Sequence, residues 1–222
     1  MAQAEERSEN TGRERILARI RNALRVPAPK HTASAGSASG GAIFAAITDP
    51  LGRFREECAL NKTECLLTSD LGASAAAVAE VLASLPAGEI FVQDSQMLRR
   101  MAALWQERAI RWSSEGGPAE ASQATITCAE ALVARTGSVF VSSGCGGRGA
   151  SIVAPVHIVV ATIDQLVPGL DQAFARLRAS GALEKHSMLC LITGSSRTAD
   201  IEKIIVMGAH GPRRVVVVLA TA

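Results

Sequence analysis

The sequence is poor in aromatic residues and has little excess charge. Its 222 residues include no tyrosine, two tryptophans and five phenylalanines, and 23 Lys and Arg face 21 Asp and Glu. The surplus of two positive charges lies in residues 1–25, which hold six Arg against four Glu, so the other 197 residues are balanced. Nucleic-acid binding depends on clustered cations, and single-strand binding adds aromatic stacking. We therefore expect no nucleic-acid partner.

Long apolar runs are also missing. A membrane-spanning helix needs about 20 consecutive apolar residues, whereas the longest clean run here, Val215–Ala220, has the length of a strand. The first residues, MAQAEERSENTGRERI, mix both charges and lack the apolar stretch of a secretory signal. We expect no membrane span and a cytoplasmic location.

The five cysteines lack the spacing of a metal site, because no two are separated by two residues. We therefore expect this chain to bind no metal and no cofactor of its own. Cys190 lies in an apolar run and is expected to be buried and inert. Cys145 lies in a glycine-rich loop and is the cysteine expected to be exposed.

The chain length suits one large domain with an appendage. Residues 12–24 place Ile16, Ile20 and Leu24 at helical intervals, which predicts an amphipathic N-terminal helix within residues 1–25. Residues 26–41 are rich in Pro, Ala, Ser and Gly and predict a flexible linker, and residues 42–222 form the main domain. Such a helix either docks on its own domain or a partner chain, or packs loosely as a frayed terminus.

From Ile43 onward, helical segments alternate with short apolar runs that read as strands covered on both faces. This pattern predicts an α/β fold with a mixed or mostly parallel sheet flanked by helices. The expected helices are residues 43–60, 73–85, 95–108, a short one ending at 133, 170–179 and 199–207. The expected strands are residues 64–68, 89–92, 124–128, 138–142, 152–161, 188–193 and 214–219.

The loop after the apolar run 188–193 has the composition of an anion site. Gly194 permits a tight turn, Ser195, Ser196 and Thr198 supply hydroxyls, and Arg197 supplies a forked cation for a carboxylate or phosphate. The amino terminus of the helix expected at 199–207, with Asp200 in its first turn, would complete the cradle. The alternative is that these residues only cap that helix.

A second loop, residues 142–149, contains four glycines and Arg148. Such a backbone permits close approach to a ligand or closure over it, and we expect Arg148 to close over an anion bound where the two loops converge. Its spacing is not that of a dinucleotide-binding loop. The alternative is a plain connection between strands.

Two histidines are candidate proton carriers. His157 follows Pro155 at the start of an apolar strand, and His210 lies in a glycine-flanked turn before the last strand. A histidine with a near-neutral pKa acts as a general acid or base. In the alternative, each one fixes a turn by binding a backbone carbonyl.

An ordered set of motifs resembles the lactate utilization protein C family (LutC/YkgG, the LUD domain). These motifs are Thr136-Gly137-Ser138, Pro155-Val156-His157, the run SRTADIE from Ser196 to Glu202, and GAHGP from Gly208 to Pro212. The resemblance implies a fold similar to the NagB/RpiA/CoA-transferase group. It also implies oxidation of L-lactate to pyruvate together with two iron–sulfur partner proteins, which hold the clusters.

The resemblance supplies no catalytic residues; Thr136, Gly137 and Ser138, which precede the expected strand 138–142, are placed among the anion-binding residues as part of the loop assignment. Arg135 stands where family members commonly have an acidic residue, so any role of that carboxylate is missing here. The leading hypothesis is a subunit of an L-lactate-oxidising system that binds a small anionic ligand. The alternatives are an assembly or regulatory module for iron–sulfur proteins and a stand-alone phosphosugar or CoA-ester enzyme, for which no carboxylate base stands out in the sequence.

Overall fold

The computed structural model describes residues 2–26, 44–105, 107–117, 119–199, 205–207 and 211–222. The chain divides into two compact units, residues 1–45 and residues 46–222. Within the described ranges, no helix is both long enough and apolar enough to cross a membrane. The predicted linker falls mostly on residues outside these ranges.

The first unit contains one helix, α1 (Ala2–Leu24), so the predicted N-terminal helix is confirmed and begins ten residues earlier. Ile16, Ile20 and Leu24 follow one another at intervals of four residues and therefore share one face of the helix. Their side chains are exposed by 58%, 49% and 77%. The apolar stripe of α1 is thus open to solvent within this unit.

The second unit is built on a six-stranded sheet in which every neighbouring pair of strands is parallel. The strands, in spatial order, are β1 (Thr63–Thr68), β12 (Arg214–Ala220), β7 (Val156–Thr162), β4 (Ala124–Cys128), β2 (Ile90–Val92) and β3 (Ile110–Trp112). Strands β7 and β12 are almost entirely buried along their length. Burial on both faces explains why they read as continuous apolar runs.

One face of this sheet is covered by α3 (Leu71–Ala83) and α4 (Gln96–Met101), and α4 continues into a 3-10 turn, Ala102–Leu104. Both helices begin at a side-chain cap. The carboxylate of Asp70 accepts from the amide of Ala73, and the hydroxyl of Ser95 accepts from the amide of Leu98. These caps lie directly after β1 and β2, so both helices start at the carboxyl edge of the sheet.

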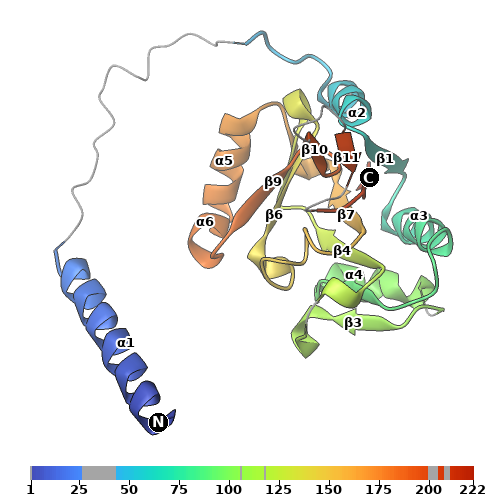
Figure 1. Ribbon diagram of the computed structural model, residues 1–222. Coiled ribbons are helices and arrows are strands. Elements are labelled where there is room, and N and C mark those ends of the chain that lie inside the picture. The colour runs from blue at the N-terminus through green and yellow to red at the C-terminus, as the bar shows by residue number, and fades with distance from the viewer. Residues whose placement is uncertain (1, 27–43, 106, 118, 200–204, 208–210) are drawn as a thin grey trace. The chain divides into compact units, whose positions relative to one another are not determined.

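A second, mixed sheet packs on the other face of the first one, with the order β8 (Leu166–Val167), β5 (Ala131–Val133), β6 (Ser138–Ser142) and β9 (Leu189–Ile192). Helix α2 (Pro50–Leu60) adds Phe54 and Cys58 to the core between the two sheets. Helices α5 (Leu170–Ala179) and α6 (Ala182–Lys185) cover the outer face of the second sheet. Figure 1 shows α3 and α4 beside the first sheet and α5 and α6 beside the second. The predicted α/β fold with a mostly parallel main sheet flanked by helices is confirmed.

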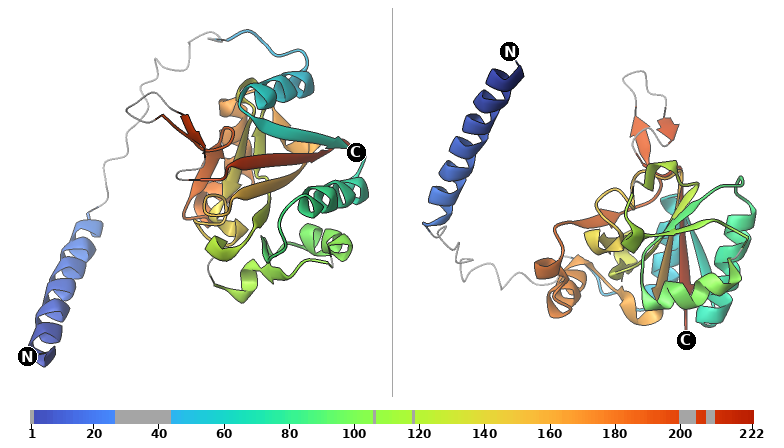
Figure 2. Two further views of the ribbon diagram at one scale, coloured as in Figure 1. Left: turned by 45° about the vertical axis from the view of Figure 1, so that its right-hand side comes forward. Right: turned by 90° about the horizontal axis from the view of Figure 1, so that it is seen from below.

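Several predicted elements are corrected. The helix expected at 199–207 is wrong, because β10 (Arg197–Ala199) pairs antiparallel with β11 (Ile205–Met207). Figure 2 shows this pair projecting from the rest of the second unit. Its sequence is rich in β-branched residues, which favour strands. The short helix expected to end at 133 is instead strand β5, and the helix expected at 43–60 begins only at Pro50.

Candidate functional site

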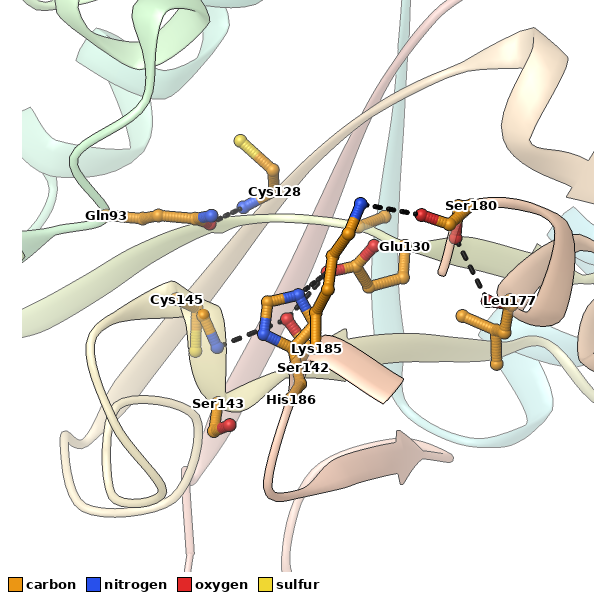
Figure 3. A network of polar contacts seen from close by, with 12 residues as sticks. Gln93, Cys128, Glu130, Ser142, Ser143, Cys145, Leu177, Ser180, Lys185 and His186 are labelled. Atoms are coloured by element: carbon orange, nitrogen blue, oxygen red, sulfur yellow. Dashed lines mark hydrogen bonds and ion pairs between the residues drawn. The ribbon is translucent and has the colours of Figure 1, made fainter. Parts of the chain in front are cut away.

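A carboxylate, a hydroxyl and an imidazole meet just beyond the carboxyl end of β4. Glu130 follows that strand by two residues, and its Oε1 accepts a hydrogen bond of 2.6 Å from the hydroxyl of Ser142. The Nε2 atom of His186 lies 3.8 Å from the same Oε1. Figure 3 shows the three side chains pointing toward one another from three separate segments. We take this cluster of Glu130, Ser142 and His186 as the candidate site.

Local structure explains how each member reaches the site. The amide of Glu130 donates to the carbonyl of Phe140 at 2.7 Å, which ties the end of β4 to strand β6. Ser142 is the last residue of β6, where the strand pairs with Leu189 of β9. His186 is the C-cap residue directly after helix α6, three residues before β9 begins. Strand β6 and the segment before β9 therefore position the hydroxyl of Ser142 and the imidazole of His186 beside the carboxylate of Glu130, which follows strand β4 of the parallel sheet.

The site is accessible but partly shielded from water. The side chains of Glu130 and His186 are each 26% exposed, while Ser142 is 2% exposed. A protonated His186 forms an ion pair with Glu130, and a neutral His186 leaves the carboxylate with the Ser142 hydroxyl as its donor. The arrangement therefore suits a carboxylate that accepts a proton or a hydrogen bond from a ligand hydroxyl.

The neighbouring strand end adds polar groups from β2 and β4. The amide of Cys128 donates to Oε1 of Gln93 at 2.7 Å, and the Cys128 sulfur lies 3.4 Å from the hydroxyl of Ser95. Burial raises the pKa of the Cys128 thiol, which the hydrogen bond with Ser95 opposes. Cys128 is therefore a neutral thiol beside the site (Figure 3).

The glycine-rich turn after β6 closes one side of the site. A Cβ on Gly144 would lie 2.5 Å from Cε1 of His186, so the absence of a side chain there allows the imidazole to pack on the turn. Cys145 in this turn is 2% exposed, and burial raises the pKa of its thiol to about 12. The expectation that Cys145 is exposed is wrong. Arg148, the predicted closing residue, is exposed three residues farther along the same turn.

Ser138 of the predicted Thr136-Gly137-Ser138 motif meets the end of strand β9, at the opposite end of β6 from this cluster. Because Val139 pairs with Ile192, the start of β6 lies beside the end of β9. The hydroxyl of Ser138 lies 2.7 Å from those of both Thr136 and Thr193. Gly137 adopts a left-handed φ of 60° at this turn. Ser138 thus contacts Thr193, the residue before Gly194. Thr136 and Gly137 instead contact the end of helix α2, because the carbonyl of Thr136 accepts from the side-chain amide of Asn61 at 3.0 Å and the carbonyl of Gly137 accepts from the Cys58 thiol at 3.7 Å.

Arg148 does not join this group, because its loop leaves the opposite end of β6. At ~3.4 Å per residue, Ser138 and Ser142 are about 14 Å apart along the strand. The predicted convergence of the two loops is therefore not found at Gly194.

The loop Gly194–Ser196 crosses the amino-terminal edge of the parallel sheet, not its carboxyl edge. A Cβ on Gly194 would lie 2.2 Å from the carbonyl oxygen of Asn61, two residues before β1. The amide of Ser196 donates to the carbonyl of Pro212 at 2.8 Å, two residues before β12. Ser195 is 5% exposed, and no hydrogen-bond partner of its hydroxyl lies in the described ranges.

The remaining anion-site residues are only partly described. Asp200 and His210 lie outside the described residues, as do the side chains of Arg197 and Thr198. Arg197 and Thr198 belong to strand β10, so the described residues place a strand, and not the predicted start of a helix, at this position. Their assignment to an anion site stays a prediction.

His157 lies inside the parallel sheet on β7 and is fully buried. Its Nε2 lies 2.8 Å from the hydroxyl of Thr127 on β4, and burial lowers the pKa of the imidazole to about 4. The near-neutral pKa expected for it is wrong. At near-neutral pH His157 is therefore an uncharged core residue. Its catalytic role stays a prediction.

Sequence reasoning missed Glu130, Ser142 and His186. One signal pointed to Glu130, since it follows the apolar run 124–128 at the position where ligand-binding loops of parallel sheets begin. No local signal pointed to His186, which is 56 residues away in the sequence. The structure therefore contains an accessible carboxylate, that of Glu130, although no candidate carboxylate base stood out in the sequence.

Comparison with known proteins gives both a domain and a fold. Residues 116–220 match the LUD domain family. Lactate utilization protein C of Halalkalibacterium halodurans is 35% identical over 99 residues, which are 43% of this chain and 43% of that protein. Lactate utilization protein C of Geobacillus thermodenitrificans is 28% identical over 200 residues, which are 81% of this chain and 82% of that protein.

A crystal structure of a DUF162 family protein from Deinococcus radiodurans matches with a TM-score of 0.60 and 20% identity, over 77% of this chain and 96% of the other. The chain spans about half the length of the first curated relatives that it matches. These matches confirm the resemblance and the fold.

Proposed function

We propose, from the match of residues 116–220 to the LUD domain family, that this chain is a subunit of a system that oxidises L-lactate to pyruvate. In this proposal the chain binds a small anionic ligand, and two iron–sulfur partner proteins hold the redox centres. The observation that carries it is the domain match, which includes Glu130, Ser142 and His186. The proposal also places the chain in the cytoplasm.

The site suits a 2-hydroxy carboxylate. L-Lactate has a hydroxyl donor and a carboxylate on neighbouring carbon atoms. The Glu130 carboxylate, already oriented by Ser142, accepts the ligand hydroxyl, and a protonated His186 attracts the ligand carboxylate. Arg148 is the nearest cation along the glycine-rich turn that could close over the bound anion.

The first test is growth of a deletion strain on L-lactate as its carbon source. We expect the wild-type gene and Glu120→Gln to restore growth, because Glu120 is exposed in the same domain and lies outside the cluster. We expect Glu130→Gln to fail on L-lactate while growth on glucose is unchanged. Full growth of the deletion strain on L-lactate would refute the role in lactate utilization.

The second test is calorimetry with L-lactate and the purified full chain. Glu130→Gln removes a charge-assisted hydrogen bond worth about 1.5–3 kcal/mol, so we expect roughly 10- to 100-fold weaker binding. Glu120→Gln is again the matched control, and circular dichroism verifies that both variants fold. Equal affinity of Glu130→Gln and wild type would place the ligand elsewhere, with the Gly194–Arg197 loop as the next location to examine.

A second candidate function is assembly of the iron–sulfur proteins through α1. The specific observation is the exposed apolar stripe of Ile16, Ile20 and Leu24. Ile20→Glu places a charge in this stripe, whereas Asn22→Glu places it on the opposite side of the helix. In co-purification with the two partners, we expect Ile20→Glu and deletion of residues 1–41 to lose the complex, and Asn22→Glu to keep it. Retention of the complex by all three variants would refute this function.

A further inference from the structure

The backbone that carries Glu130 is held from outside the candidate site. The amide of Glu130 donates to the carbonyl of Phe140, and its carbonyl accepts a hydrogen bond of 3.3 Å from Nε of Arg176. The carbonyl of the preceding residue, Ala129, accepts a hydrogen bond of 2.5 Å from Nε2 of Gln165. Both sides of the Glu130 backbone are therefore tied to other elements of the second unit.

Arg176 on helix α5 joins the ends of two neighbouring strands. Besides the carbonyl of Glu130, its guanidinium binds Asp164 twice, with Nη1 2.9 Å from the backbone carbonyl oxygen and Nη2 3.1 Å from Oδ2. Glu130 follows β4 and Asp164 follows β7, and these two strands pair in the parallel sheet. Because the guanidinium is planar and its donors point in fixed directions, it sets the position of one strand exit relative to the other.

Asp164 is itself oriented for this contact. The hydroxyl of Thr162 donates to its carboxylate. This hydrogen bond, together with those from Arg176, lowers the pKa of Asp164 against the opposing effect of burial, so the carboxylate is ionised at neutral pH. The side chains of Arg176 and Asp164 are 35% and 68% exposed. Substitutions at these two positions therefore remove polar contacts without opening the apolar core.

We propose that Arg176 is a positioning residue for Glu130. It acts through the backbone carbonyl of Glu130 and holds the carboxylate where it meets the hydroxyl of Ser142 and accepts the hydroxyl of a 2-hydroxy carboxylate. Small errors in the placement of such a group are costly, because a displacement of about 1 Å at a reacting group lowers a rate about 100-fold. This inference rests on the proposed function for the identity of the ligand, whereas the effect of Arg176 on Glu130 is measurable without a ligand.

The ligand-free test is carbon-13 NMR of the Glu130 carboxyl carbon in the full chain, with the signal assigned by its loss in Glu130→Gln. We expect Arg176→Ala to shift or broaden this signal, because the backbone carbonyl loses its donor. Arg178→Ala is the matched control, since Arg178 is an exposed arginine on the same helix, and it should leave the signal in place. Circular dichroism verifies that both variants fold. A Glu130 signal that is the same in Arg176→Ala and wild type would overturn the proposal.

Asp164→Ala provides a second variant that decides the question even if Arg176→Ala does not fold. It removes the carboxylate bound by Nη2 and leaves the other two contacts of Arg176, so it should move the Glu130 signal in the same direction by a smaller amount. An unchanged signal in Asp164→Ala, in the absence of a folded Arg176→Ala protein, would count against the proposal.

A double-mutant cycle in calorimetry with L-lactate then separates positioning from direct binding. We expect Arg176→Ala to weaken binding roughly 3- to 30-fold in the wild-type background, and less than about twofold in a Glu130→Ala background, where no carboxylate is left to position. Equal losses in the two backgrounds would overturn the proposal, because Arg176 would then act independently of Glu130. Absence of L-lactate binding by the wild type would instead refute the proposed function, and the NMR comparison would still decide whether Arg176 positions Glu130.

Discussion

Substitution of Gly194 by alanine tests whether this loop packs against helix α2 as the structure shows. Gly194 has a φ of 88°, in the left-handed region. A Cβ there would lie 2.2 Å from the carbonyl oxygen of Asn61 and 3.1 Å from its carbonyl carbon. The atoms in the way belong to the backbone, so no side-chain rotation relieves the contact. The loop or the end of α2 must shift instead.

The expected loss of stability has two parts. Placing a residue with a Cβ in a left-handed conformation costs about 1–2 kcal/mol. Forcing an extra carbon into a packed site costs about 1–3 kcal/mol more. Gly147 also has a positive φ, 105°, but a Cβ there would meet nothing within 4 Å. Gly147→Ala therefore carries the first cost without the second, and it isolates the clash at Gly194.

The assay is urea denaturation of the two full-length variants beside the wild type. We expect the free energy of unfolding to fall by roughly 2–5 kcal/mol for Gly194→Ala and by about 1–2 kcal/mol for Gly147→Ala, with unchanged slopes. Equal losses, within about 0.5 kcal/mol, would refute the close approach of Gly194 to Asn61. A Gly194→Ala variant as stable as wild type would refute both parts of the reasoning.

Two further predictions concern buried polar groups. The pKa of His157 is about 4 in the folded chain, against about 6.5 when unfolded. The unfolded state therefore binds more protons between these values, so stability is complete above pH 6.5 and falls by about 3 kcal/mol as the pH drops to 4. Urea titrations at several pH values should show a shallower fall for His157→Val, and an unchanged fall would contradict the assignment. Ser142→Ala should cost about 1–2 kcal/mol in thermal unfolding, because Glu130 and the amide of Gly144 each lose a partner. Ser143→Ala, whose hydroxyl has only a 3.3 Å contact with Ser187, should cost less than about 0.5 kcal/mol; equal costs would contradict the role of Ser142.

The parallel sheet could be predicted because its strands carry their own signal. Residues 214–220 are apolar without interruption, and the structure buries them on both faces as β12. Short strands carry no such signal. Strand β3 has three residues with Arg111 in the middle, and it was not predicted. Strand β5 also has three residues, and so short an apolar segment does not distinguish a helix from a strand. Their identity depends on the neighbours with which they pair.

The strand pair at β10 and β11 shows a related limit. Ile201, Ile204 and Ile205 stand at intervals of three and four residues, which imitates the apolar face of a helix. The pairing of Thr198 with Val206 decides the outcome. The anion-site hypothesis assigned a helix amino terminus to this segment. Because the segment is a strand, the partial positive charge of a helix amino terminus is not available beside Arg197 to help bind an anion.

The candidate site was hidden for a different reason. Glu130, Ser142 and His186 are separated by 12 and 44 residues along the chain, and they meet only because β6 pairs with both β5 and β9. By contrast, the sequence analysis singled out Gly194 as part of an anion-binding loop. The structure gives another reason for a glycine at this position, because the backbone of Asn61 leaves no room for a side chain there. A glycine in a sequence motif therefore indicates close approach of another backbone segment as readily as it indicates a bound ligand. Chemistry assembled across strands becomes visible only when the strand pairing is known, which is why a carboxylate after a parallel strand is the feature to examine first in such a sequence.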